Sequence, residues 1–119
     1  MKKSQFVLIV DDDRDWAESV ADLFLAYGYD AEIIANGRLA VDRARRADFD
    51  IAFMDVQMPV MNGVDSFFEI RKLKPEAKIV MMTGFKEAIV AKALEAGAAG
   101  LLTKPFDIAA MLAIVDRAA

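Results

Sequence analysis

The sequence predicts an α/β fold in which a doubly wound, five-stranded parallel sheet carries helices on both faces. Five short apolar runs alternate along the chain with longer segments of helical periodicity, as is typical of α/β proteins. The central runs are apolar on successive residues, which indicates strands covered on both faces. Because the connections are short, right-handed crossovers between parallel strands are expected.

The five apolar runs are the predicted strands, at residues 6–10, 31–34, 51–54, 79–82 and 100–102. Between the first two runs, apolar residues recur at helical spacing, and Gly28 stands where that helix is expected to stop. The core is expected to include Trp16, Val20, Leu23, Phe24 and Tyr27 from this helix. The other helices are predicted at residues 37–46, 64–73 and 86–96 and from Ile108 onward. The second of these five helices is expected to pack through Leu39, Ala40, Ala44 and Ala47.

The composition limits the chemistry that the chain can perform. Its 119 residues fit one domain, and 56% hydrophobic with 29% charged residues is a globular composition. The chain contains no histidine and no cysteine. These absences exclude Ser-His and Cys-His nucleophile pairs, imidazole or thiolate zinc sites, and disulfides within the chain. The remaining carboxylates, hydroxyls and lysines suit magnesium and phosphate.

The net charge of −4 argues against a nucleic-acid surface, because phosphate contacts need clustered lysine and arginine. The short cluster of Arg43, Arg45 and Arg46 is interpreted as the solvated face of a helix. No apolar run approaches the roughly 20 residues that span a bilayer, and the first run is too short for a signal peptide. We therefore expect a cytoplasmic protein with no membrane contact and no direct nucleic-acid binding.

Polar residues follow four of the predicted strands directly. They are Asp11, Asp12 and Asp13 after the first, Asp55 after the third, Thr83 after the fourth, and Thr103 and Lys104 after the fifth. Asp13 is interpreted as the N-cap of a helix that begins near Arg14, and Thr103 as a packing or local hydrogen-bonding residue. Ligands of doubly wound folds bind outside the carboxyl ends of the strands, so the other residues are expected to form a site.

Asp11, Asp12 and Asp55 would repel one another if they converged without a cation. Two carboxylates about 4 Å apart repel by about 4 kcal/mol at an effective dielectric constant of about 20. Magnesium removes this repulsion and commonly binds through carboxylates, water and a phosphate. An aspartate can also act as a nucleophile toward phosphorus. Lys104 and Thr83 would then supply a charge and a hydroxyl to the phosphoryl oxygens.

The motifs around these residues resemble those of a known family, the receiver domains of bacterial two-component response regulators. The motifs are VLIV followed by Asp11 and Asp12, IAFMDVQMPVMNG around Asp55, MMTG with Thr83, and LLTKPF with Lys104 and Pro105. The resemblance covers the whole chain and makes residues 1–119 a single receiver domain. It implies a (βα)5 fold with the flavodoxin-like strand order 2-1-3-4-5.

The resemblance also implies a role for each matched residue. Asp55 would be the phosphoacceptor, which takes a phosphoryl group from the phosphohistidine of a histidine kinase. Asp12 and Asp55 would bind Mg²⁺ directly, and Mn²⁺ can substitute. Asp11 would act mainly through water, and the backbone carbonyl of Gln57 would be a further ligand.

The matched positions predict how the phosphoryl group is held and how the signal leaves the site. Thr83 and Lys104 would contact the phosphoryl group, and the peptide between Lys104 and Pro105 is expected to be cis. Receivers commonly carry Tyr or Phe three residues before the lysine as a switch position, where this chain has Leu101. We therefore expect loop and helix shifts, with a change in the burial of Leu101, to replace ring rotation.

The family's partners would be a cognate histidine kinase or phosphotransfer protein and a downstream protein or output domain. The partner surface would be formed by the fourth predicted helix (residues 86–96), the fifth predicted strand (residues 100–102) and the fifth predicted helix (from Ile108), and a homodimer could use the same surface. The chain would phosphorylate and dephosphorylate itself, and it would not be an enzyme that turns over an external metabolite.

Three alternatives are weaker on the residues. A haloacid-dehalogenase-type hydrolase needs a second aspartate two residues after the nucleophile, where this chain has Gln57. A flavodoxin-like cofactor binder needs a phosphate-binding loop after the first strand, where aspartates repel the ligand. A degenerate receiver would act as a phosphorylation-independent protein-binding module; Leu101 leaves room for it, whereas Asp55 and Lys104 argue against it.

Overall fold

The computed structural model describes residues 5–58, 60–84, 88–104 and 107–118. The strands are β1 (Phe6–Val10), β2 (Asp30–Ile34), β3 (Ile51–Asp55), β4 (Ile79–Thr83) and β5 (Gly100–Thr103). The helices are α1 (Arg14–Ala26), α2 (Gly37–Arg46), α3 (Gly63–Leu73), α4 (Ala88–Glu95) and α5 (Ile108–Ala118). Each predicted strand is confirmed to within one residue at either end. The expected cis peptide before Pro105 lies outside the described residues.

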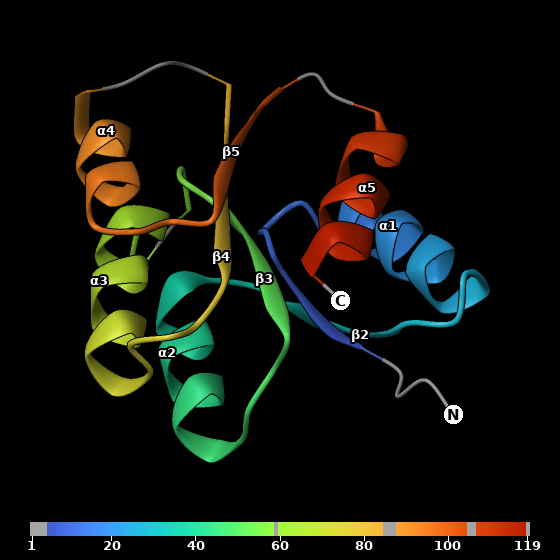
Figure 1. Cartoon of the computed structure of the whole chain (residues 1–119), viewed down its shortest axis with the longest axis horizontal. Helices are drawn as coiled ribbons and strands as arrows, with labels where there is room; N and C mark the ends of the chain where they lie inside the picture. The colour runs from blue at the N-terminus through green and yellow to red at the C-terminus, as the bar shows by residue number, and fades with distance from the viewer. Residues whose placement is uncertain (1–4, 59, 85–87, 105–106, 119) are drawn as a thin grey trace.

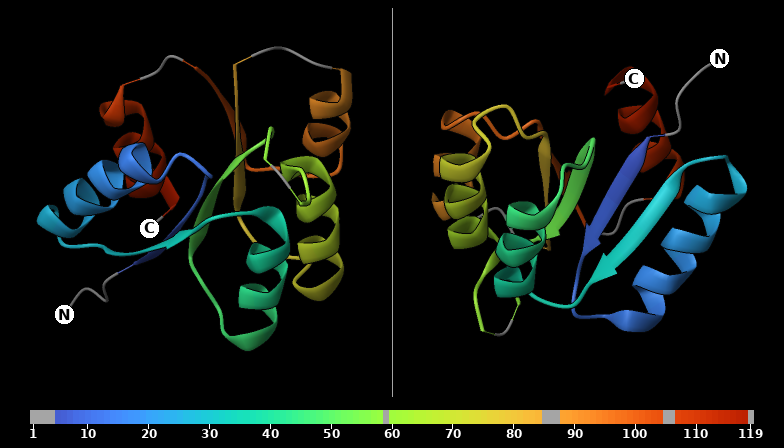
Figure 2. Two further views of the ribbon diagram at one scale, coloured as in Figure 1. Left: turned by 180° about the vertical axis from the view of Figure 1, so that it is seen from behind. Right: turned by 90° about the horizontal axis from the view of Figure 1, so that it is seen from below.

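The strands form one parallel sheet in the order β2-β1-β3-β4-β5. Helices α1 and α5 cover one face, and α2, α3 and α4 cover the other, so the predicted doubly wound fold is confirmed (Figure 1). The views from behind and from below show the same layers (Figure 2). Strand order reverses at β1, because the chain passes to β2 on one side of it and to β3 on the other.

The sheet separates two apolar clusters, one under each helical layer. The cluster beneath α2, α3 and α4 contains Leu8, Met54, Phe67, Ile70 and Met81, all fully buried. The cluster beneath α1 and α5 contains Ile9, Phe24, Phe53, Met82 and Met111, also fully buried. Successive apolar residues of β1, β3 and β4 therefore enter different clusters, which explains why these strands are apolar at every position before the polar residues that end β3 and β4.

The ends of α1 match the sequence signals. The Asp13 carboxylate accepts a hydrogen bond from the backbone N–H of Trp16 at 3.2 Å, which confirms Asp13 as the N-cap. At the other end, Gly28 has φ of +89°, a conformation that glycine adopts without the steric cost of a Cβ atom. The carboxylate of Asp13 therefore caps α1, a role that Asp11 and Asp12 do not share.

Four expected core residues are exposed, and these predictions were wrong; one of them, Ala47, is the C-cap of α2. Leu23, Tyr27 and Leu39 expose 40%, 65% and 48% of their surface. Tyr27 is the C-cap of α1 and lies beyond the last helical turn, so helical spacing does not point it at the sheet. In α2 the predicted Ala40 and Ala44 are buried, and they share the buried side with Gly37, Val41 and Arg43.

Arg43 also corrects the interpretation of the arginine cluster as a solvated face. It is 93% buried, whereas the other two arginines of the cluster are exposed. Its guanidinium donates to Glu32 Oε1 at 2.9 Å and to the Ala47 carbonyl at 2.8 Å. The guanidinium carbon also lies 5.2 Å from the centre of the Phe6 ring. These contacts join α2 to β1 and β2.

Among the described residues, no helix is long and apolar enough to cross a membrane.

Candidate functional site at the carboxyl ends of the strands

The parallel register brings the predicted site residues to one edge of the sheet. Asp11 directly follows β1, Asp55 is the last residue of β3, and Thr83 is the last residue of β4. Lys104 directly follows β5, whose Thr103 pairs with Thr83. The backbone N–H of Lys104 donates to the Thr83 carbonyl at 2.7 Å, which ties these two strand ends together.

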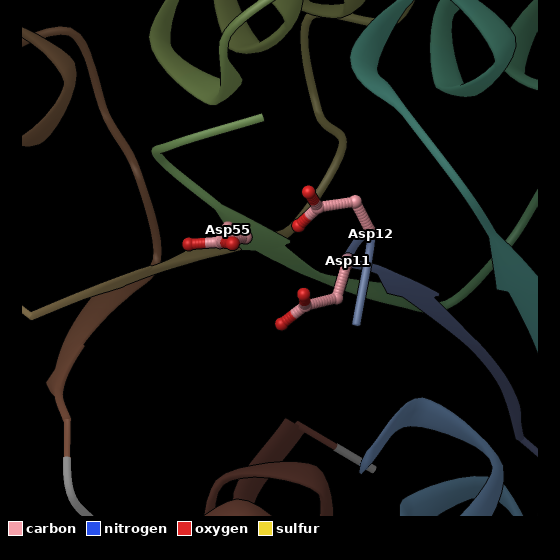
Figure 3. Close-up of side chains that lie close together, drawn as sticks. All are labelled: Asp11, Asp12 and Asp55. Atoms are coloured by element: carbon pink, nitrogen blue, oxygen red, sulfur yellow. The ribbon is translucent and has the colours of Figure 1, made fainter. Parts of the chain in front are cut away.

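Three carboxylates meet at this edge. One carboxylate oxygen from each of Asp11, Asp12 and Asp55 lies within 4.8 Å of the others (Figure 3). Asp11 and Asp55 are buried, whereas Asp12 is exposed. The backbone holds Asp11 in place, because its N–H donates to the Ile34 carbonyl at 3.0 Å. Its carboxylate accepts a hydrogen bond from the Asp13 N–H at 2.9 Å.

The Lys104 ammonium lies on the side of the cluster formed by Asp11 and Asp55. Its Nζ atom is 3.3 Å from Asp11 Oδ2 and 3.6 Å from Asp55 Oδ1. The side chain of Lys104 is about one-third exposed, whereas that of Asp55 is only 10% exposed. One ammonium therefore pairs with two of the three carboxylates, and among the described residues that line the cluster negative charge is in excess.

The surroundings of Asp55 shift its pKa. Burial, and secondly the Asp11 carboxylate, raise the pKa of Asp55 from its ordinary value of 3.8 to about 6. The Lys104 ammonium and a hydrogen bond from the Gln57 N–H, 3.4 Å from Asp55 Oδ1, lower the pKa but do not cancel the rise. The surroundings of Asp55 therefore disfavour its charged form.

The loop after β3 is shaped by a close approach to Asp55. A Cβ atom on Gly63 would lie 2.1 Å from the backbone oxygen of Asp55, so only glycine fits at the start of α3. The Gly63 N–H donates to the Val56 carbonyl at 2.9 Å. In the same loop, Val60 has φ of +72° and exposes 80% of its surface, which is a strained conformation for a β-branched residue.

The remaining predicted residues lie at different depths. Thr83 is fully buried at the end of β4. Leu101, the predicted switch position, is half-buried in β5 and packs against the cluster beneath α2, α3 and α4. Its sensitivity to phosphorylation stays a prediction.

One residue beside the site was assigned by sequence reasoning only to the core. The ring centre of Trp16 lies 5.5 Å from Lys104 Nζ. The available signal was its place in the first turn of a helix that begins at the carboxyl end of β1. Which side of that turn faces Lys104 depends on how α1 crosses the sheet, and the sequence does not contain that angle.

The donor set fits a hard divalent cation. Its members offer carboxylate oxygens, and the Lys104 ammonium pairs with only two of the three carboxylates. Magnesium prefers oxygen ligands and usually keeps several waters, which an edge with an exposed Asp12 allows.

The fold and this edge define a class of protein: a doubly wound α/β protein with an acidic site where strand order reverses. The family model described as the response regulator receiver domain matches residues 7–116. The chain belongs to this family of two-component response regulator domains.

Individual relatives agree with the family match. The chain is 40% identical over 102 residues to the chemotaxis protein CheY of Thermotoga maritima, covering 84% of this chain and 85% of that one. The structure of a CheY-like receiver domain protein from Methanospirillum hungatei has a TM-score of 0.91 at 28% identity, covering 97% of this chain and 93% of that one. The CheX-CheY-BeF3-Mg complex of Borrelia burgdorferi has a TM-score of 0.87 at 29% identity, covering 95% and 87%.

Other relatives are longer proteins. The chain spans between 23% and 46% of the length of several regulatory relatives, most of which carry the name of a transcriptional regulatory protein.

Proposed function

We propose that this chain is a phosphorylation-controlled switch in which Asp55 is the phosphoacceptor. A carboxylate oxygen of Asp55 bonds to the phosphorus of a phosphohistidine as the P–N bond breaks. The electron pair of that bond stays on the imidazole nitrogen, and the imidazole leaves. Because the pKa of Asp55 is about 6, the nucleophilic carboxylate form dominates at pH 7.

Lys104 and Thr83 would hold the transferred group. The Lys104 ammonium already lies 3.6 Å from Asp55 Oδ1, so it can pair with a phosphoryl oxygen after a small movement. Thr83 ends the neighbouring strand, and its hydroxyl would donate to another phosphoryl oxygen. Both residues lie at the edge where the register places Asp55.

Asp11, Asp12 and Asp55, together with the backbone carbonyl of Gln57, would hold Mg²⁺, or Mn²⁺ in its place. The bound ion would neutralise negative charge where the phosphoryl group enters. This assignment is supported by the close approach of the three carboxylates and by their hard oxygen atoms.

The proposed phosphodonor is a histidine kinase or a phosphotransfer protein, and the proposed target is a downstream protein or an output domain. The target would bind the surface formed by α4, β5 and α5, where Leu101 changes burial, and a second copy of the chain would use the same surface. The longer relatives named as transcriptional regulatory proteins support an output domain as one form of target.

The observation that carries this proposal is the buried, raised-pKa carboxylate of Asp55 between Lys104 and two further aspartates. Incubation with Mg²⁺ and acetyl phosphate, followed by intact-protein mass spectrometry, tests it. The parent should gain the mass of one phosphoryl group, and Asp55→Asn should not. Omission of Mg²⁺ should also prevent the gain. A gain that persists in Asp55→Asn would reject Asp55 as the acceptor.

A phosphorylation-independent binding module is the second candidate, and the aliphatic Leu101 at the switch position favours it. The same experiment separates the two functions. A parent that gains no mass would support the binding module.

A further inference from the structure

Trp16 lies beside the site but has no part in the chemistry proposed above. The Asp13 carboxylate accepts a hydrogen bond from its backbone N–H, which fixes it in the first turn of α1. Its ring is half-buried and packs against the cluster beneath α1 and α5. The indole is therefore held by the body of the fold, next to the carboxyl edge of the sheet.

The indole lies next to the Lys104 ammonium. Lys104 Nζ lies 5.5 Å from the centre of the Trp16 ring, within the distance at which a cation is attracted to an aromatic face. Among aromatic side chains, Trp gives the strongest such attraction. The same ammonium lies 3.3 Å from Asp11 and 3.6 Å from Asp55, so carboxylates and an uncharged ring both hold it.

We propose that Trp16 is a positioning residue that keeps the Lys104 ammonium directed at Asp55, and this role rests on the proposed phosphoacceptor function. The ion pairs of Lys104 with Asp11 and Asp55 change whenever a cation binds there or Asp55 becomes phosphorylated. The attraction to the indole does not depend on the charge of Asp55, so it persists through these changes. A lysine on a flexible four-carbon stem gains most from such a fixed neighbour.

The contact itself is tested without phosphorylation by a double-mutant cycle. The parent, Trp16→Leu, Lys104→Met and the double variant are unfolded in urea at pH 7 without divalent metal. The four unfolding constants should deviate from additivity by about two- to five-fold, which corresponds to about 0.5–1 kcal/mol. If the effects of the two substitutions on the free energy of unfolding are additive, Trp16 and Lys104 do not interact, whether or not Asp55 is a phosphoacceptor.

The positioning role is tested by the rate of phosphoryl uptake from acetyl phosphate at saturating Mg²⁺, followed by intact mass. Trp16→Leu should be roughly two- to five-fold slower than the parent, and Trp16→Phe should recover part of the rate. Tyr27→Leu is the matched control, because it removes an exposed aromatic ring from the other end of α1, and its rate should equal that of the parent.

The Lys104→Met background separates positioning from packing. There, with long incubation, Trp16→Leu should cause no additional slowing, because the ammonium on which it acts is gone. An equal fold of slowing by Trp16→Leu in both backgrounds, or no slowing by Trp16→Leu in the protein that retains Lys104, would overturn the positioning role. A parent that gains no phosphoryl group contradicts the proposed function itself, and the urea cycle then decides whether Trp16 and Lys104 interact.

Discussion

The two edges of the sheet use charged side chains in opposite ways. At the carboxyl edge, three carboxylates lie within 4.8 Å of one another, the Lys104 ammonium pairs with Asp11 and Asp55, and the pKa of Asp55 rises to about 6. At the amino edge, the charges are paired with groups of the opposite sign or with the backbone. Asp50 accepts a hydrogen bond from the Phe6 N–H at 2.6 Å, and the Lys74 ammonium lowers the pKa of Asp48 by a hydrogen bond.

Charged groups near the amino edge stabilise the fold, whereas the fold holds the charged groups of the carboxyl edge in positions that are unfavourable for their charge. Near the amino edge, Arg43 joins α2 to β2 and stacks on Phe6, so its charge supports the packing. At the carboxyl edge, Asp55 is buried beside another carboxylate, which disfavours its charged form. Stability measurements should therefore respond with opposite signs to removal of charge at the two places.

The largest effect is expected from Arg43→Met. The change removes the hydrogen bonds to Glu32 and to the Ala47 carbonyl, and hydrogen bonds of charged groups contribute about 1.5–3 kcal/mol. The free energy of unfolding in urea should fall by about 2 kcal/mol. Arg45→Met is the control, because the ion pair of Arg45 with Asp42 is half exposed on both sides, and it should change little. Equal losses in the two variants would contradict the structural role of Arg43.

Asp55→Asn should stabilise the metal-free protein at pH 7. The substitution keeps the shape of the side chain and removes a charge that burial and Asp11 disfavour. A pKa raised by about two units predicts a gain in the free energy of unfolding of about 1–2 kcal/mol after allowance for solvent screening. Urea unfolding in the presence of a chelator measures it.

With Mg²⁺ bound, the parent should become more stable than Asp55→Asn. At a hundred times its Kd, Mg²⁺ would stabilise the parent by about 2.7 kcal/mol, and it would stabilise Asp55→Asn less. A metal-free Asp55→Asn variant that is less stable than the parent would show that the charge of Asp55 favours the fold.

The pH dependence of stability should carry the signature of the same group. Because the folded-state pKa of Asp55, about 6, lies above its ordinary value of 3.8, the folded protein binds more protons between these values. The contribution of Asp55 is then full below about pH 4 and is lost as pH rises through about 6. Urea unfolding of the parent and of Asp55→Asn across this pH range isolates the contribution of Asp55. The difference in the free energy of unfolding in favour of Asp55→Asn should grow as pH rises. A constant difference would disprove the raised pKa.

The smallest effect is expected from Asp48→Asn. Asp48 is exposed, and its hydrogen bond with Lys74 lies at the surface, so screening by solvent and salt leaves little net stabilisation. The urea midpoint at neutral pH should not change measurably. A clear loss of stability would mean that the amino-edge ion pairs contribute more than exposure suggests.

Much of the fold could be predicted because it depends on local pattern. The apolar runs, the Asp13 cap and the stop at Gly28 each rest on the chemistry of a few neighbouring residues, and the structure has all three. The set of site residues was also predictable, because parallel strands bring their carboxyl ends to one edge. The absence of histidine and cysteine had already restricted that site to carboxylate, hydroxyl and ammonium groups.

The tertiary structure alone decided which faces of the helices meet the sheet. Tyr27 and Leu39 follow helical spacing but are exposed, whereas Arg43 is charged but buried, because the crossing of each helix over the sheet fixes what its sides contact. The same crossing brings Trp16 next to Lys104, two residues 88 positions apart. Distances between carboxylates, and hence the raised pKa of Asp55, likewise depend on how distant segments pack, which one-dimensional pattern does not record.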